Sequence, residues 1–180
     1  MKYVRPYTLY MSLEKKAIEL IKNDAIGIQL LGLNVLPHYF SISISNPYID
    51  GAVHHGIVEM NGRNISKLTN VFQTLIPKYN IEAAVIGCPD AKNMENLEDV
   101  KVNSVAYALC NTGKFEGLKF TYWDTTRIDS KFVEWMSKDP NLPDDHPDNN
   151  LEDFHDRFSS VYTLQSYLDH FGKMAQRKDD

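Results

Sequence analysis

The sequence predicts an α/β fold in which a mixed five-stranded sheet is flanked by helices. Three strand-like segments follow one another through short connections, which is typical of an antiparallel meander. Two later apolar strands are separated by amphipathic helices, and strands joined through helices are normally parallel with right-handed crossovers. At 180 residues the chain fits one domain that can bury a core without disulfides or structural metal.

The first half of the chain begins with a helix and continues with the meander. Leu9, Leu13, Ala17, Leu20 and Ile21 lie at helical spacing on one side of the N-terminal segment. The three strands are expected at about 26–35, 39–46 and 52–60, and the second alternates between apolar residues and serines until the Asn-Pro break at 46–47.

The second half alternates helices and strands. We expect helices at about 64–79 and 95–111, strands at 81–87 and 118–124, a short helix near 129–138 and a long helix from about 151. This order matches a ribonuclease-H-like domain, which we place at 26–176, after an N-terminal helical extension at 1–25. The same topology serves resolvases, transposases and ATPases, so the fold does not fix the chemistry.

Composition narrows the function classes. A formal net charge of −5 argues against a general nucleic-acid binder, although local basic patches remain compatible with it. Cys88 and Cys110 stand in apolar surroundings and are expected to be free thiols in a reducing compartment. No apolar run approaches the ~20 residues that span a bilayer. We therefore expect a cytoplasmic protein without a membrane partner.

Asn34 is the one strongly polar residue in the apolar run 28–36. A buried polar group costs about 1–3 kcal/mol unless it is satisfied, so Asn34 is either hydrogen-bonded structure or part of a site. An aspartate there would offer a full charge to a divalent metal, whereas asparagine offers one neutral carbonyl oxygen.

Four segments carry a family resemblance: Leu30-Leu31-Gly32-Leu33-Asn34-Val35 with Ile42-Ser43-Ile44-Ser45-Asn46-Pro47, then Ala84-Val85-Ile86-Gly87-Cys88-Pro89, then Tyr122-Trp123-Asp124 with Arg127, and finally the stretch from Asp156 to Leu168. In order and spacing they resemble the YqgF/RuvX family of ribonuclease-H-like proteins, described as Holliday-junction resolvases and pre-16S rRNA processing nucleases. The family motifs read LGLDxG with GxAxSDP, VVGxP, WDERLT and DxxAAxxILxxYL. The N-terminal Met-Lys-Tyr-Val-Arg-Pro is similar to plant members.

The resemblance implies a nuclease site in which three carboxylates hold Mg²⁺ or Mn²⁺. The position of the first carboxylate is occupied by Asn34, and that of the second by Thr126, or by Thr125 if no residue is inserted. The third is retained as Asp156. Asp124 is a further acid of the third segment, so Asp156 and Asp124 are the remaining candidate ligands of a weakly held ion.

Other residues complete the candidate site. Arg127 and His38 are the candidates for contacting substrate, and Asp129 or Asp153 would have to replace the missing acids. His54 and His55 alternate faces of a predicted strand, so at most one points toward the site.

Structural explanations compete with these assignments. Asp124 would also cap the following turn, Asp156 would gain stability from the helix dipole, and Trp123 and Trp135 would fill the core. Two glycines of the family motifs are also replaced: Leu36 stands where the family has the glycine after the first carboxylate, and Ser41 stands where it has the glycine of the second strand.

The implied function is metal-dependent hydrolysis of a phosphodiester in rRNA processing, with pre-rRNA or another structured nucleic acid as the partner. Because two of three acids are substituted, we expect activity to be weak or lost. The alternative is an inactive paralogue that binds RNA or a protein partner. A sugar-kinase-like ATPase half is disfavoured, since the sequence has no Gly-rich phosphate loop.

Overall fold

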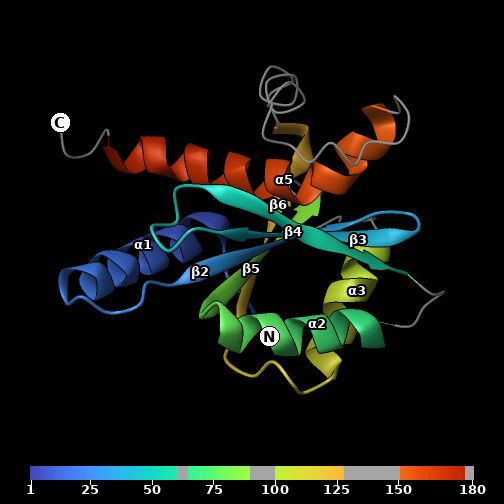
Figure 1. Cartoon of the computed structure of the whole chain (residues 1–180), viewed down its shortest axis with the longest axis horizontal. Coiled ribbons are helices and arrows are strands. Elements are labelled where there is room, and N and C mark those ends of the chain that lie inside the picture. Colours follow the sequence, from blue (N-terminus) through green and yellow to red (C-terminus); the bar gives the residue numbers. More distant parts are fainter. Residues whose placement is uncertain (61–64, 90–99, 128–150, 177–180) are drawn as a thin grey trace.

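The computed structural model describes residues 1–60, 65–89, 100–127 and 151–176. The elements in chain order are β1 (Lys2–Tyr3), α1 (Pro6–Lys22), β2 (Gln29–Val35), β3 (Tyr39–Ser45), β4 (Ala52–Glu59), α2 (Ser66–Lys78), β5 (Ile81–Cys88), α3 (Val100–Asn111), β6 (Lys119–Asp124), the 3₁₀ turn η2 (Thr125–Arg127) and α5 (Leu151–Gln176). The strands form one sheet in the order β1-β6-β5-β2-β3-β4 (Figure 1).

The sheet confirms the predicted mixed topology. β2, β3 and β4 are antiparallel, whereas β5 is parallel to both β2 and β6. The predicted five strands are β2 to β6, and a sixth, β1, pairs in parallel with β6 at the edge. β1 has only 2 residues, too few to show the alternation by which strands are recognised in a sequence.

Helices cover both faces of the sheet, with α2 and α3 on one face and α5 and α1 on the other (Figure 1). Each face has its own apolar core. The core under α2 and α3 includes Leu33, Phe72, Ile86 and Leu109. The core under α1 and α5 includes Leu30, Val85, Trp123 and Tyr167, so Trp123 fills the core as expected.

α5 approaches the sheet closely, where small polar residues replace large apolar ones. A Cβ at Gly32 of β2 would lie 2.9 Å from the carbonyl oxygen of Ser160 and 3.0 Å from Leu164 Cβ. Ser41 Oγ donates to the carbonyl of Arg157 (2.5 Å), and Ser43 Oγ donates to that of Ser160 (2.9 Å). These hydrogen bonds fix the position of α5 along β3.

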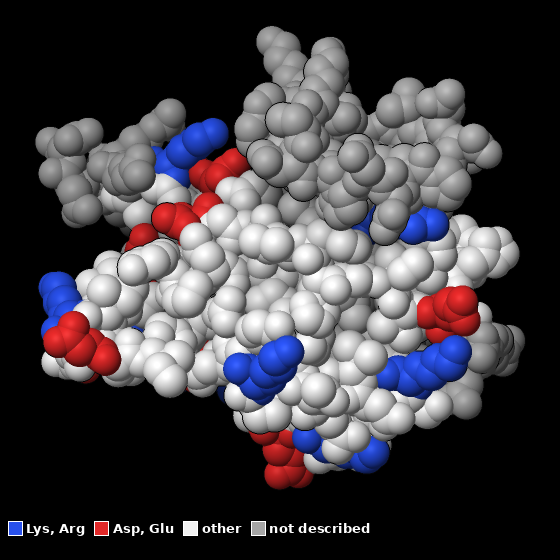
Figure 2. Space-filling view, in the orientation of Figure 1, with Lys and Arg blue, Asp and Glu red and all other residues white. Residues whose placement is uncertain are grey.

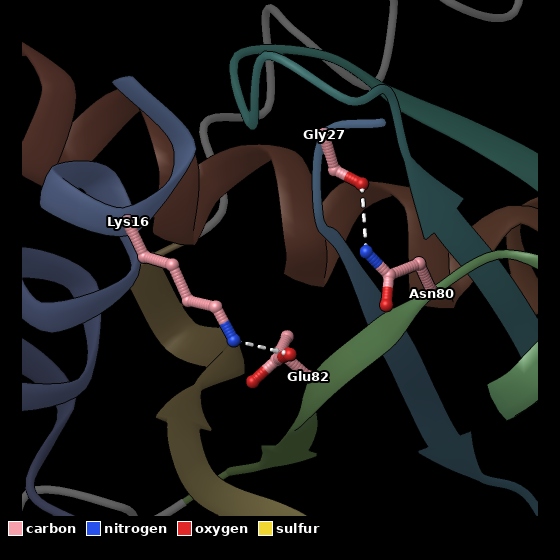
Figure 3. Close-up of polar contacts among 4 residues, drawn as sticks. All are labelled: Lys16, Gly27, Asn80 and Glu82. Carbon is pink, nitrogen blue, oxygen red and sulfur yellow. Dashed lines mark hydrogen bonds and ion pairs between the residues drawn. The ribbon is translucent and has the colours of Figure 1, made fainter. Parts of the chain in front are cut away.

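α1 is attached to the sheet by polar as well as apolar contacts. Lys16 Nζ lies 2.6 Å from Glu82 Oε1 of β5, and nearby Asn80 Nδ2 donates to the carbonyl of Gly27 (3.0 Å; Figure 3). Tyr167 of α5 donates its hydroxyl to the carbonyl of Pro6 (3.0 Å). Ile21 belongs to the apolar face predicted for this helix but is 37% exposed. Tyr10, which was not in that prediction, is buried in the core.

The structure can also be compared with the predictions for the two cysteines and for membrane-spanning segments. Cys88 is buried and Cys110 partly buried, and both are free thiols. None of the described helices is long and apolar enough to cross a membrane. The short helix near 129–138, with Asp129 and Trp135, lies outside the described residues, as does the side chain of Asp153.

Candidate functional site

The candidate site lies at the sheet edge where β2, β5 and β6 end. These three strands are parallel neighbours, so their carboxyl ends lie side by side. Ligands of open α/β sheets bind at this edge. Asn34 is next to last in β2, Gly87 next to last in β5, and Thr125 follows β6 directly.

Asn34 is 9% exposed and faces α5. Its neighbour Leu33 belongs to the core on the opposite face, as the alternation of a strand requires. A Cβ on Gly87 would lie 2.2 Å from Asn34 Oδ1, so the glycine makes room for the amide. Asn34 Oδ1 accepts no hydrogen bond from any described residue. A buried acceptor of this kind costs about 1–3 kcal/mol, which leaves it open to an external donor.

The side chains of Asp124 and Thr125 lie on opposite faces of the sheet at the end of β6. Asp124 follows the alternation of Tyr122, whose side chain belongs to the core under α2 and α3, so it points away from Asn34. Asp124 Oδ1 accepts hydrogen bonds from the backbone N–H (3.0 Å) and the hydroxyl (2.6 Å) of Thr126. These bonds cap the 3₁₀ turn, which is the structural alternative expected for Asp124.

Thr125, in contrast, lies beside Asn34. Its Cγ2 would be 3.0 Å from a Cβ on Gly87, the same point that Asn34 Oδ1 approaches. Of the two threonines that the sequence left open, Thr125 therefore shares a face with Asn34, while Thr126 turns its hydroxyl back to Asp124.

Asp156 reaches this edge from α5. Ser41, which is paired with Asn34 in the β2–β3 register, contacts the carbonyl of Arg157 and lies 2.8 Å from Ser160 Oγ. Asp156 is one helical turn before Ser160, so it lies toward the Asn34 end of the sheet. Its side chain is half-buried. Asp156 thus lies toward the same edge of the sheet as Asn34 and Thr125.

His38 is exposed in the turn between β2 and β3, where its carbonyl accepts a hydrogen bond from Met60 (2.8 Å). The backbone of Arg127 forms part of η2, and its side chain lies outside the described residues. The structure therefore does not describe how either of these two side chains would contact a substrate.

Of the two histidines that the sequence left open, His54 is the one on the face of the sheet that α5 covers. It is paired with Ser43, and its ring packs against Phe158 of α5 at a centroid distance of 4.6 Å and an interplanar angle of 36°. Burial lowers the pKa of His54 below its usual value, and the nearby His55 and Arg157 lower it further. The imidazole is therefore neutral near pH 7.

The donor set does not fit a pair of divalent ions. Two-ion hydrolysis requires several carboxylates to offset the metal charge. Asn34 and Thr125 are neutral, and Asp124 caps its turn on the opposite side. In the described part of the chain, no group of three His, Cys, Asp or Glu side chains is arranged to hold a metal.

Comparisons with known proteins identify the fold. No protein-family model and no curated protein matches the sequence. Among solved structures, this chain is similar to RuvC of T. thermophilus in complex with a Holliday junction substrate. The superposition covers 81% of this chain and 96% of the RuvC chain, with a TM-score of 0.54 and 9% sequence identity. The chain therefore has the ribonuclease-H-like fold that the sequence predicts. A protein of Bacteroides thetaiotaomicron with an actin-like ATPase fold and unknown function covers 63% of this chain and 57% of its own at 16% identity, but its TM-score of 0.33 carries no argument.

Proposed function

We propose that this protein is a homologue of the YqgF/RuvX nucleases that binds structured nucleic acid, with pre-rRNA as the substrate class implied by the sequence, and whose hydrolytic activity is weak or lost. The observation that carries this proposal is Asn34, a buried neutral amide at the sheet edge, where the resemblance implies a carboxylate. The RuvC whose fold this chain resembles is bound to a junction substrate, which supports the choice of nucleic acid as ligand.

Neutral side chains suit binding without metal. A carboxylate near a phosphodiester repels it unless a cation intervenes, by about 1 kcal/mol at 4 Å in water and about 4 kcal/mol at an effective dielectric constant of 20. Asn34 and Thr125 remove that repulsion, and an asparagine amide can donate to a phosphate oxygen. Binding should therefore not depend on Mg²⁺ or Mn²⁺.

Fluorescence anisotropy tests this proposal. The two ligands are a four-way DNA junction and a structured rRNA-precursor fragment, and each is measured in EDTA and in Mg²⁺. We expect equal affinity in both buffers and little cleavage. Asn34→Asp should weaken binding in EDTA by about tenfold, which corresponds to 1.4 kcal/mol. Asn70→Asp, the same substitution at an exposed residue of α2, serves as the control for net charge.

Two results would contradict the proposal. One is Mg²⁺-dependent cleavage by the unaltered protein that disappears in Asp156→Ala, because it would establish a working metal site. The other is the absence of binding to either nucleic acid in both buffers, because this edge of the sheet would then serve another ligand.

A further inference from the structure

A concave site lies at the opposite end of α5 from Asn34. It is a pocket of about 320 Å³ between α1, the turn that joins β3 to β4, and the last turns of α5. Its walls include Tyr10, Glu14, Ile18, Tyr48, Asp50 and Gly172. Gly172 lies beside the tyrosine hydroxyl, because a Cβ there would be in van der Waals contact with Tyr10 Oη at 3.5 Å.

The β3–β4 turn that forms one wall is held in place by its own hydrogen bonds. Asn46 Oδ1 accepts from the backbone N–H of Asp50 (3.2 Å), and Asn46 Nδ2 donates to Asp50 Oδ1 (2.5 Å). Gln165 of α5 donates to the carbonyl of Asp50 (2.9 Å). Gly27 also permits the approach of Pro47, whose carbonyl oxygen would lie 2.7 Å from a Cβ at position 27. The wall is therefore largely organised before any ligand binds.

Two carboxylates face the hydroxyl of Tyr10 in this pocket. Tyr10 Oη donates to Glu14 Oε1 (3.3 Å), and burial together with the charges of Glu14 and Asp50 raises the pKa of Tyr10 to about 12. The ion pairs formed among the described residues are Lys16–Glu82 and Lys67–Glu59, so neither pocket carboxylate has a cationic partner there. Figure 2 shows acidic side chains, with a basic side chain against them, where the end of α5 meets the β3–β4 turn.

The rim of the pocket is apolar and exposed. Ile18 is 47% exposed, Ile21 37% and Tyr48 64%, and all three line the pocket. Exposed apolar residues that adjoin one another around a pocket mark interaction sites, whereas single ones do not. A small cation would fill the pocket but leave this rim in water.

We propose that this pocket binds an arginine side chain presented by an apolar segment of a partner protein. The guanidinium would bond to the carboxylates of Glu14 and Asp50, and its planar face would stack on Tyr48. The flanking apolar residues of the segment would cover Ile18 and Ile21. Arginine fits better than lysine because it offers five donors in a fixed plane to two carboxylates, and arginine and tyrosine are enriched among residues that dominate binding energy.

A short amphipathic peptide with one arginine in a leucine stripe tests the proposal against the full chain. Matched peptides carry citrulline, the neutral isostere of arginine, or lysine at the same position. We expect the arginine peptide to bind at least about tenfold more tightly than either matched peptide. Amide NMR signals of Gly172 and Ile49 should shift with the arginine peptide, because both residues line the pocket.

The double variant Glu14→Gln with Asp50→Asn should reduce the affinity for the arginine peptide to that for the citrulline peptide. Glu19→Gln, an exposed acid elsewhere on α1, should leave it unchanged. If the double variant does not fold, the comparison of arginine with citrulline on the unaltered protein remains decisive.

Equal binding of arginine and citrulline peptides would overturn the proposal, as would an equal loss in Glu19→Gln, which would indicate general charge attraction. Equal binding of the lysine peptide would overturn the assignment to arginine. Self-association in sedimentation experiments that Glu14→Gln with Asp50→Asn abolishes would identify a second copy of this chain as the occupant and overturn the assignment to a different partner. None of these results affects nucleic-acid binding at the other end of α5.

Discussion

The two ends of α5 present opposite arrangements of acidic residues. Near its start, the site between β2 and β6 has neutral Asn34 and Thr125 beside Gly87, and Asp124 is used to cap a turn. Near its end, Glu14 and Asp50 line a pocket without a cationic partner among the described residues. Acids at both ends accept hydrogen bonds from neighbouring residues, so the difference lies in where their side chains point: Asp124 faces away from Asn34, whereas Glu14 and Asp50 line a pocket.

Close packing at the first end should give the largest effect on stability. In Gly32→Ala the new Cβ would collide with Ser43 Oγ, the carbonyl oxygen of Ser160 and Leu164 Cβ, so α5 must shift from the sheet. We expect a loss of about 3 kcal/mol in the free energy of unfolding, measured in urea. Gly172→Ala, at the other end of the same helix, should cost less than about 0.5 kcal/mol or stabilise the protein, because its Cβ finds room and alanine favours helix.

A smaller effect tests the contact between Asn34 and Gly87. Gly87→Ala should cost about 2 kcal/mol, because the new methyl group displaces the Asn34 amide. In an Asn34→Ala background the same change should cost about 1 kcal/mol less, a coupling typical of residues in contact. Additive losses in this double-mutant cycle, measured by chemical unfolding, would mean that the two side chains do not compete for the same space.

The two threonines should differ in a way that follows their positions. Thr126→Val removes the hydroxyl bonded to Asp124 Oδ1 and should cost about 1 kcal/mol in thermal or urea unfolding. Thr125→Val, of the same shape, should stay within about 0.5 kcal/mol of the unaltered protein. If Thr125→Val costs more than Thr126→Val, the Thr125 hydroxyl makes a hydrogen bond stronger than the one that Thr126 Oγ1 donates to Asp124.

The pH dependence of stability should report on His54. Its pKa is lowered in the folded state, chiefly by burial, so below about pH 6.5 the unfolded chain binds a proton that the folded chain does not. Stability should therefore fall as the pH decreases from 6.5 and level off below the folded-state pKa. His54→Gln should flatten this part of the curve, whereas an unchanged slope would assign it to other groups, with His55 the first to test.

The sequence predicted the sheet because its strands and helices have clear apolar periodicity. It also placed Asn34 in a buried strand and offered the capping role for Asp124 that the hydrogen bonds to Thr126 now describe. It did not separate Thr125 from Thr126, because neighbouring residues differ only in which face they occupy at the strand end. That distinction depends on the register of β6 against β5.

The pocket between α1 and the end of α5 was not predicted at all. Its residues come from three segments that are distant in sequence, and neither Glu14 nor Asp50 stands in a motif. Tyr48 and Ile18 carry no local signal either, because exposed apolar residues are common on protein surfaces. Only the packing of α1 against α5 brings these side chains together.

Calorimetric titration with Mn²⁺ tests whether the sheet edge beside Asp156 lacks the carboxylates that a pair of metal ions requires. We expect no tight binding of two ions by the unaltered protein and a gain in Asn34→Asp with Thr125→Glu. Asn34→Asp with Thr126→Glu, the matched control, should gain less, because position 126 is directed toward Asp124. Tight binding of two Mn²⁺ ions by the unaltered protein would overturn the proposed loss of hydrolytic activity.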